Sequence, residues 1–83
     1  IMNRKKTQQK NILTLLYYLA KSHKDETYPH DIHALAALGG KPTLKRLMEL
    51  KRKNWVKNHS KHKWGLTIQG IEKAKKIIQK DQQ

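Results

Sequence analysis

Apolar residues recur at intervals of three and four within residues 7–22, which predicts an amphipathic helix over that range. The positions that form this stripe are Ile12, Leu13, Leu15, Leu16, Leu19 and Ala20. Thr7 precedes the stripe and is expected to cap the helix, because its hydroxyl can accept a hydrogen bond from a free backbone N–H. The helix is therefore expected to bury one face in a small core.

Two further helices are predicted on either side of a glycine pair. Residues 32–38 form a short helix with Asp31 as its N-cap. Gly39-Gly40 ends that helix. Pro42 suits the first turn of a third helix over residues 42–53, where a missing N–H costs nothing. The apolar positions expected to be buried on the third helix are Leu44, Leu47, Met48 and Leu50.

The rest of the chain predicts a hairpin and a last helix. Asn54 can adopt the left-handed conformation that ends a helix. Two short apolar runs in residues 55–66 flank the polar stretch 58–63, which is typical of two strands joined by a basic tip. Thr67 is expected to cap a helix over residues 68–80. Its apolar face consists of Ile71, Ala74, Ile77 and Ile78.

The order of these elements predicts one domain, mainly α with a small β-hairpin. The domain covers residues 7–80, with a basic N-terminal arm at 1–6 and a tail at 81–83. A short extended piece is expected at 27–28, because Pro29 disfavours helix at the residue before it. Two helices joined by a short glycine-containing turn are the DNA-binding unit of helix-turn-helix proteins, and the hairpin after them would be a wing.

Two segments of the sequence resemble winged helix-turn-helix transcription regulators, including the multiple-antibiotic-resistance and phenolic-acid-decarboxylase types. The first segment, residues 47–56, ends a helix with a leucine pair and opens a strand with an apolar pair; Asn54 stands where that family has glycine. The second, residues 66–74, has the leucine-threonine-x-x-glycine start of the family's last helix. The resemblance covers about residues 31–78 and implies a prokaryotic regulator that binds double-stranded DNA.

Charge points to a polyanionic partner. The chain has 19 Lys and Arg against six Asp and Glu, a net charge of +13. Residues 41–63 contain nine of these cations and only one acid, Glu49. Such a field attracts DNA, RNA or an anionic membrane surface. Lys41, Lys45 and Lys51 are expected to hold phosphates, which fix the register of a protein on a duplex.

Arg46 is the expected base-reading residue, because it lies early in the third helix and its planar guanidinium matches guanine O6 and N7. Lys45 takes that role if the register differs by one residue, and Arg52 is the second arginine of the segment. Thr43 is expected at a thymine methyl or a phosphate. The expected interface comprises Lys41, Thr43, Lys45, Arg46, Glu49, Arg52, Lys57, His59, Ser60, Lys61, His62 and Lys63.

The hairpin tip is expected to reach the minor groove or the flanking backbone, since narrow grooves attract Lys, Arg and His. Trp55 and Trp64 flank the hairpin and are expected to anchor it as a cross-strand pair, in preference to stacking on bases.

No enzyme, cofactor or metal site is expected. The chain lacks cysteine, a glycine-rich phosphate loop and paired carboxylates in an apolar setting. Its acidic cluster, Asp25, Glu26 and Asp31, lies in a polar loop. Two histidine pairs, 30/33 and 59/62, lie on separate elements, and zinc needs three or four ligands.

The expected partners are double-stranded DNA and a second copy of the chain, because the helices at 7–22 and 68–80 carry more apolar surface than one small core needs. No small-molecule effector is implied. No apolar run approaches 18 residues, so a cytoplasmic protein without a membrane span is expected. Two alternatives stay open: an accessory DNA-binding protein of a mobile element, acting in replication, partition or transfer, and a winged-helix module that binds protein or RNA.

Overall fold

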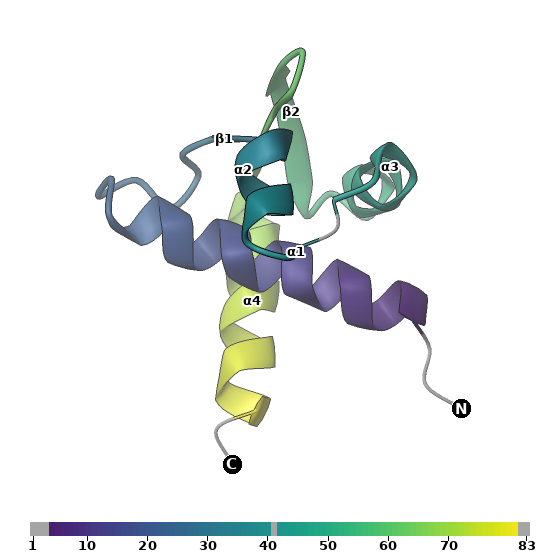
Figure 1. Ribbon diagram of the computed structural model, residues 1–83. Coiled ribbons are helices and arrows are strands. Elements are labelled where there is room, and N and C mark those ends of the chain that lie inside the picture. Colours follow the sequence, from purple (N-terminus) through teal and green to yellow (C-terminus); the bar gives the residue numbers. More distant parts are fainter. Residues whose placement is uncertain (1–3, 41, 82–83) are drawn as a thin grey trace.

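The computed structural model describes residues 4–40 and 42–81 (Figure 1). The protein is mainly helical, with a small antiparallel sheet. The elements in chain order are α1 (Arg4–Lys21), β1 (His30–Asp31), α2 (Ile32–Ala37), α3 (Leu44–Arg52), β2 (Val56–Ser60), β3 (Lys63–Leu66) and α4 (Ile68–Asp81).

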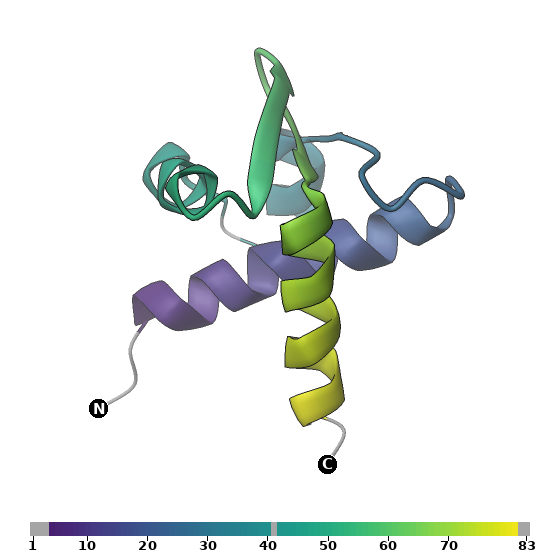
Figure 2. The ribbon, with the colours of Figure 1, turned by 180° about the vertical axis from the view of Figure 1, so that it is seen from behind.

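Helix α1 runs through the middle of the molecule. Figures 1 and 2 show α2, α3 and the β2–β3 hairpin on one side of α1, while the C-terminal half of α4 extends on the other side. Side chains from α1, α2, α3 and the strands meet in one core. Its largest fully buried members are Ile12, Leu13, Leu16, Leu35, Leu47, Leu50, Leu66 and Val56. Each such side chain contributes about 1.5–3 kcal/mol on burial.

The start of α1 corrects the sequence prediction. The helix begins by Arg4, so residues 4–6 belong to it and do not form an arm, while residues 1–3 lie outside the described part. Thr7 lies inside the helix and does not cap it. Positive charge at a helix N-terminus opposes the macrodipole. Here Lys5 is compensated by Glu49 of α3, with 3.2 Å between Nζ and Oε2.

The sheet has one strand more than the predicted hairpin. Its order is β1-β3-β2, with His30 opposite Trp64 and Asp31 opposite Lys63. The expected extended piece at 27–28 is a turn, because Thr27 donates from its backbone N–H and its hydroxyl to the Asp25 carboxylate. The extended pair therefore lies after Pro29 and adds a third strand to the hairpin.

The connection between α2 and α3 follows the predicted capping at both ends of α2 but not at the start of α3. Asp31 accepts a hydrogen bond from His33 N at 2.7 Å, and Gly39 adopts a left-handed φ of 80° that ends α2. Pro42 is buried but precedes the N-cap, because Thr43 Oγ1 accepts from Arg46 N at 3.2 Å. Helix α3 therefore starts at Leu44, two residues later than predicted.

Local hydrogen bonds fix the end of α3 and the start of α4, on either side of the hairpin. Asn54 has a φ of 62°, and the N–H of Trp55 donates to Leu50 O at 3.1 Å, as expected for a left-handed helix end. Thr67 caps α4 by accepting from Gly70 N at 3.0 Å. A Cβ at Gly70 would overlap the carbonyl oxygen of Trp55, which explains why glycine stands there. The predicted roles of Asn54 at the end of α3 and of Thr67 at the start of α4 are confirmed.

Candidate nucleic-acid interface

The outward side of α3 is a mixed apolar and cationic surface. Successive helix residues are about 100° apart, so Leu44, Met48 and Arg52 share one side, with Lys45 and Lys51 beside them. All five are exposed. Leu44 and Met48 are 63% and 37% exposed, so the predicted burial of these two residues is wrong. The buried stripe of α3 is narrower than predicted and consists of Leu47 and Leu50.

Arg46 does not lie on that outward side. Its side chain is only 18% exposed and joins α3 to α1. Nη1 donates to both carboxylate oxygens of Glu49, at 3.1 and 3.2 Å, and Nε donates to Gln8 Oε1 at 3.0 Å. A guanidinium held this way has to break three hydrogen bonds to reach a base. The position of Arg46 in the predicted interface is therefore corrected: it belongs to the contact between α1 and α3.

Glu49 is the centre of this α1–α3 contact and also leaves the predicted interface. Besides Arg46, it accepts from Gln9 Nε2 at 3.1 Å and pairs with Lys5. Burial alone would raise the pKa of Glu49, but hydrogen bonds from Gln9, Lys5 and Arg46, together with the charge of Arg46, lower it to about 2. The carboxylate therefore stays ionised and is shared between two cations, Lys5 and Arg46.

The α1 partners in this contact, Lys5, Gln8 and Gln9, were not identified from the sequence. Gln9 is the one buried polar residue of the described chain. The only signal that could have found the contact is that Glu49 is the single acid among residues 41–63. A single acidic residue in so basic a segment indicates that its carboxylate makes a specific contact.

The β2–β3 hairpin presents the predicted polar residues to solvent. Its exposed side chains are Lys57, His59, Ser60, Lys61, His62 and Lys63. Asn58 Nδ2 donates to the carbonyls of Ser60 and Lys63, each at 3.1 Å, where the strand register shifts. This irregularity shapes the tip without using the exposed cations, which stay available to a ligand.

The hairpin tip is also attached to the start of α2. The N–H of Ile32 donates to His62 O at 2.8 Å, and the rings of His33 and His62 lie 5.8 Å apart. The tip is thereby held in a fixed position relative to α2 and the turn that leads to α3. Of the other predicted residues, Thr43 is exposed with its hydroxyl engaged as the N-cap, and Lys41 lies outside the described residues.

The two tryptophans do not form the expected cross-strand pair. Trp64 is 4% exposed and lies in the core, where it is opposite Asn58 on β2 and His30 on β1. Trp55 precedes β2 and is half-buried. The ammonium groups of Lys53 and Lys73 lie 4.9 and 5.1 Å from the centroid of its ring. This cation–π arrangement links the end of α3 to α4.

The histidines pair differently from their spacing in the sequence. His30 packs with His23 and Tyr28, each ring centroid 5.4 Å away, while His23 and Tyr28 stack at 3.8 Å. His30 Nε2 is buried without a hydrogen-bond partner, and burial, followed by the charge of His23, lowers the pKa of His30. Within the described residues no group of three or more His, Asp or Glu side chains is placed to hold a metal.

The chain matches no protein-family model, no curated protein and no solved structure. Among residues 4–40 and 42–81, no helix is long and apolar enough to cross a membrane. The functional inference therefore depends on the exposed face of α3 and on the hairpin.

Proposed function

We propose that this chain is a winged helix-turn-helix protein that binds double-stranded DNA sequence-specifically and regulates transcription. In this proposal α2, the glycine turn and α3 form the helix-turn-helix, α3 enters the major groove, and the β2–β3 hairpin is the wing. Helix α3 and the hairpin lie on the same side of α1, which supports the proposal because one duplex can then contact both (Figures 1 and 2).

The observation that carries the proposal is the composition of the two exposed surfaces. The outward side of α3 offers Lys45, Lys51 and Arg52, and the hairpin offers three more cations, Lys57, Lys61 and Lys63. No acidic side chain is exposed on either element, because Glu49 is turned toward α1. A helix with such a surface fits the major groove, while the hairpin cations suit phosphates or the minor groove.

Within this proposal the base-reading role passes from Arg46 to Arg52. Arg52 has the same guanidinium group and is exposed, so it can make two hydrogen bonds to guanine O6 and N7. Leu44 and Met48 lie on the same side and suit contact with thymine methyl groups, which explains why apolar side chains stand exposed there. Lys45 and Lys51 then hold the flanking phosphates.

A homodimer is also part of the proposal, since regulators of this kind read two-fold sites. Tyr18 of α1 and Leu38 after α2 are each more than half exposed, and they line one shallow depression together with Leu15. These residues are the apolar surface that a second copy would cover.

Selection of bound sites from random duplexes, followed by footprinting, tests the proposal. The expected result is a short preferred sequence, with protection of the major groove at its centre. Enrichment of no sequence by the parent protein would contradict it, and preferential retention of single-stranded RNA would favour the alternative of an RNA-binding module.

A further inference from the structure

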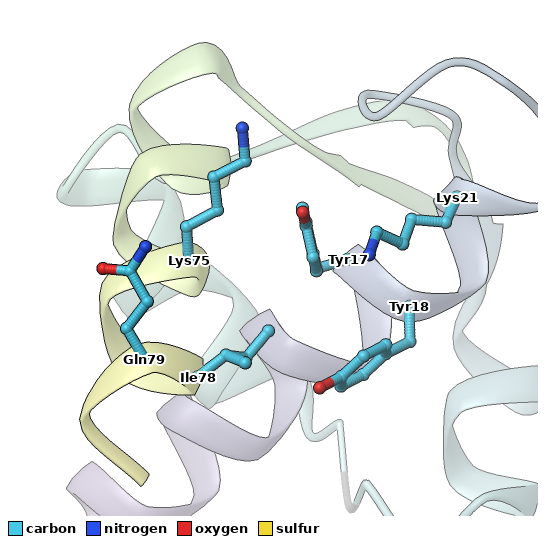
Figure 3. A pocket seen from close by; sticks show the side chains of 6 residues that line it. All are labelled: Tyr17, Tyr18, Lys21, Lys75, Ile78 and Gln79. Atoms are coloured by element: carbon cyan, nitrogen blue, oxygen red, sulfur yellow. The ribbon is translucent and has the colours of Figure 1, made fainter. Parts of the chain in front are cut away.

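Helix α4 crosses α1 and leaves a hollow on each of its two flanks. One hollow is lined by Tyr17, Tyr18, Lys21, Lys75, Ile78 and Gln79 (Figure 3). The other, which we call the lysine groove, is lined by Lys10, Lys73, Lys76, Ile77, Lys80 and Asp81. The two hollows use the same pair of helices, so they differ in the side chains that line them and not in their architecture.

The cations of the first hollow are already engaged within the protein. Lys21 lies 5.1 Å from the centre of the Tyr17 ring, and the Lys75 ammonium is 3.9 Å from Glu26 Oε2. Figure 3 shows the Tyr17 ring between these two lysines. This flank of α4 therefore has internal partners for its charge.

The lysine groove is different, because its cations have few partners. Lys73 shares the Trp55 ring with Lys53. Within residues 4–40 and 42–81, the side chains of Lys10, Lys76 and Lys80 make no hydrogen bond, ion pair or ring contact. Lys76 and Lys80 are four residues apart on one helix face, where like charges destabilise the helix, and Glu72, one turn before Lys76, forms no ion pair with it in the described part of the chain. A row of this kind becomes favourable when an external polyanion neutralises it.

Most of the groove lies away from the proposed reading surface. Lys76 and Lys80 are on the half of α4 that extends beyond α1, away from α3 and the hairpin (Figures 1 and 2), whereas Lys73 reaches the Trp55 ring beside the end of α3. The molecule measures 35 × 26 × 24 Å, whereas duplex DNA stays straight over a persistence length of about 50 nm. A duplex seated on α3 and the hairpin therefore cannot bend around the molecule to reach the groove at small cost.

We propose that the lysine groove binds the phosphate backbone of a second duplex, so that one chain bridges two DNA segments. The groove is lined by four lysines against one acid, Asp81, and its one aliphatic residue, Ile77, is buried in the core, so charge is the main feature that it offers to a partner. It offers no exposed arginine, amide or apolar side chain that could read bases, so this second contact is independent of sequence. This inference rests on the proposed function in one respect: the first of the two duplexes is the one that α3 and the hairpin bind.

Two double variants that remove the same charge test this proposal. Lys10→Gln/Lys76→Gln takes one lysine from α1 and one from α4 in the groove, and Lys21→Gln/Lys75→Gln takes one from each helix in the opposite hollow. Thermal melting and sedimentation first establish that both variants fold and self-associate like the parent. Each protein is then bound to an immobilised duplex that carries the selected site, free protein is washed away, and capture of a second, labelled duplex of random sequence is titrated against salt.

The parent and Lys21→Gln/Lys75→Gln are expected to capture the second duplex equally. Lys10→Gln/Lys76→Gln is expected to bind the immobilised duplex normally, to capture the second one weakly, and to show a log–log salt slope shallower by about 2 for that capture. Equal capture by both variants, or no capture by the parent, would overturn the bridging proposal. If Lys45→Gln/Arg52→Gln leaves selection of the first duplex unchanged while capture still depends on Lys10 and Lys76, the proposed reading surface is wrong and the groove proposal stands.

Discussion

The two long sides of α3 carry the same kinds of residue but use them differently. On the side toward α1, Arg46 and Glu49 satisfy each other and hold Gln8, Gln9 and Lys5 in place. On the outward side, Arg52 and its neighbours Lys45 and Met48 face solvent. Two arginines six positions apart therefore serve opposite purposes: one fixes the orientation of the helix, and the other is available to a ligand.

Charge counted along a sequence therefore overstates the charge that a folded helix offers to a partner. Of the cations between residues 41 and 63, Arg46 is neutralised internally, and Lys53 lies over the Trp55 ring. The cations that stay exposed on α3 and the hairpin are the ones that the proposed duplex would contact.

The largest effect is expected from the core. Leu47→Ala should destabilise the protein by about 2–5 kcal/mol, because it empties a site that is fully buried between α3 and α1. Met48→Ala, one residue further on the outward side, should change stability by about 0.5 kcal/mol or less. Urea unfolding followed by circular dichroism measures both. Similar losses for the two variants would mean that the outward side of α3 is covered in solution.

The second prediction separates the two arginines. Arg52→Ala should cost about 1–3 kcal/mol on the preferred duplex and reduce discrimination at one base pair, with little change in melting temperature. Arg46→Ala should lower the melting temperature, because it leaves the partly buried Glu49 without one of its two cationic partners. Binding titrations on preferred and scrambled duplexes, together with thermal melts, distinguish them. The assignment is reversed if Arg46→Ala loses discrimination while Arg52→Ala keeps it.

The pH dependence of stability sharpens the account of the inward side. The pKa of Glu49 is about 2 in the folded protein, below its ordinary value of 4.5. A carboxyl group whose pKa is lowered on folding stabilises the native state fully above its unfolded pKa, and this contribution is lost as the pH falls from 4.5 toward 2. The parent should therefore be more stable than Glu49→Gln above pH 4.5, and the difference should shrink below it.

Melting temperatures of both proteins across that range measure this difference. Glu72→Gln, at an exposed position of α4, removes the same charge and serves as the control. A gap between parent and Glu49→Gln that does not depend on pH would contradict the role given to the Glu49 carboxylate.

The smallest effect is expected at the hairpin. The five exposed lysines that the proposal places at phosphates, on α3 and the hairpin, give a log–log salt slope of about −4.5 for duplex binding. Lys61→Ala should weaken binding to all sequences similarly and make the slope shallower by about one. A loss confined to the preferred sequence would instead place Lys61 at a base edge.

Most helices and several of their ends were predictable because they depend on local signals, whereas Thr7 was wrongly predicted as a cap and Thr43 was not identified as one. The periodicity in α1 and α4, the caps Asp31 and Thr67, and the left-handed Asn54 all follow from neighbouring residues in the sequence. The contact between Arg46 and Gln8 was not predictable, because the two residues are 38 positions apart and either side chain could have faced solvent. Strand β1 was missed because two residues carry no periodicity, and they become a strand only by pairing with β3.

The apolar stripe of α3 was predicted too wide for a related reason. Periodicity alone cannot distinguish an apolar residue that packs from one that stays exposed for a ligand. Leu44 and Met48 continue the pattern of Leu47 and Leu50, but α1 and β2 cover only part of the helix circumference. The exposed apolar residues of α3 are among the observations on which the proposed reading surface depends.

Interference by guanine methylation tests whether the outward side of α3 reads bases through Arg52, as proposed. Methylation at N7 blocks the major-groove acceptor that a guanidinium needs. The account predicts that methylation of a particular guanine in the selected site prevents binding of the parent and of Arg46→Ala, and that Arg52→Ala is insensitive to methylation of that same guanine. Interference that persists at that guanine in Arg52→Ala, or none in the parent, would contradict it.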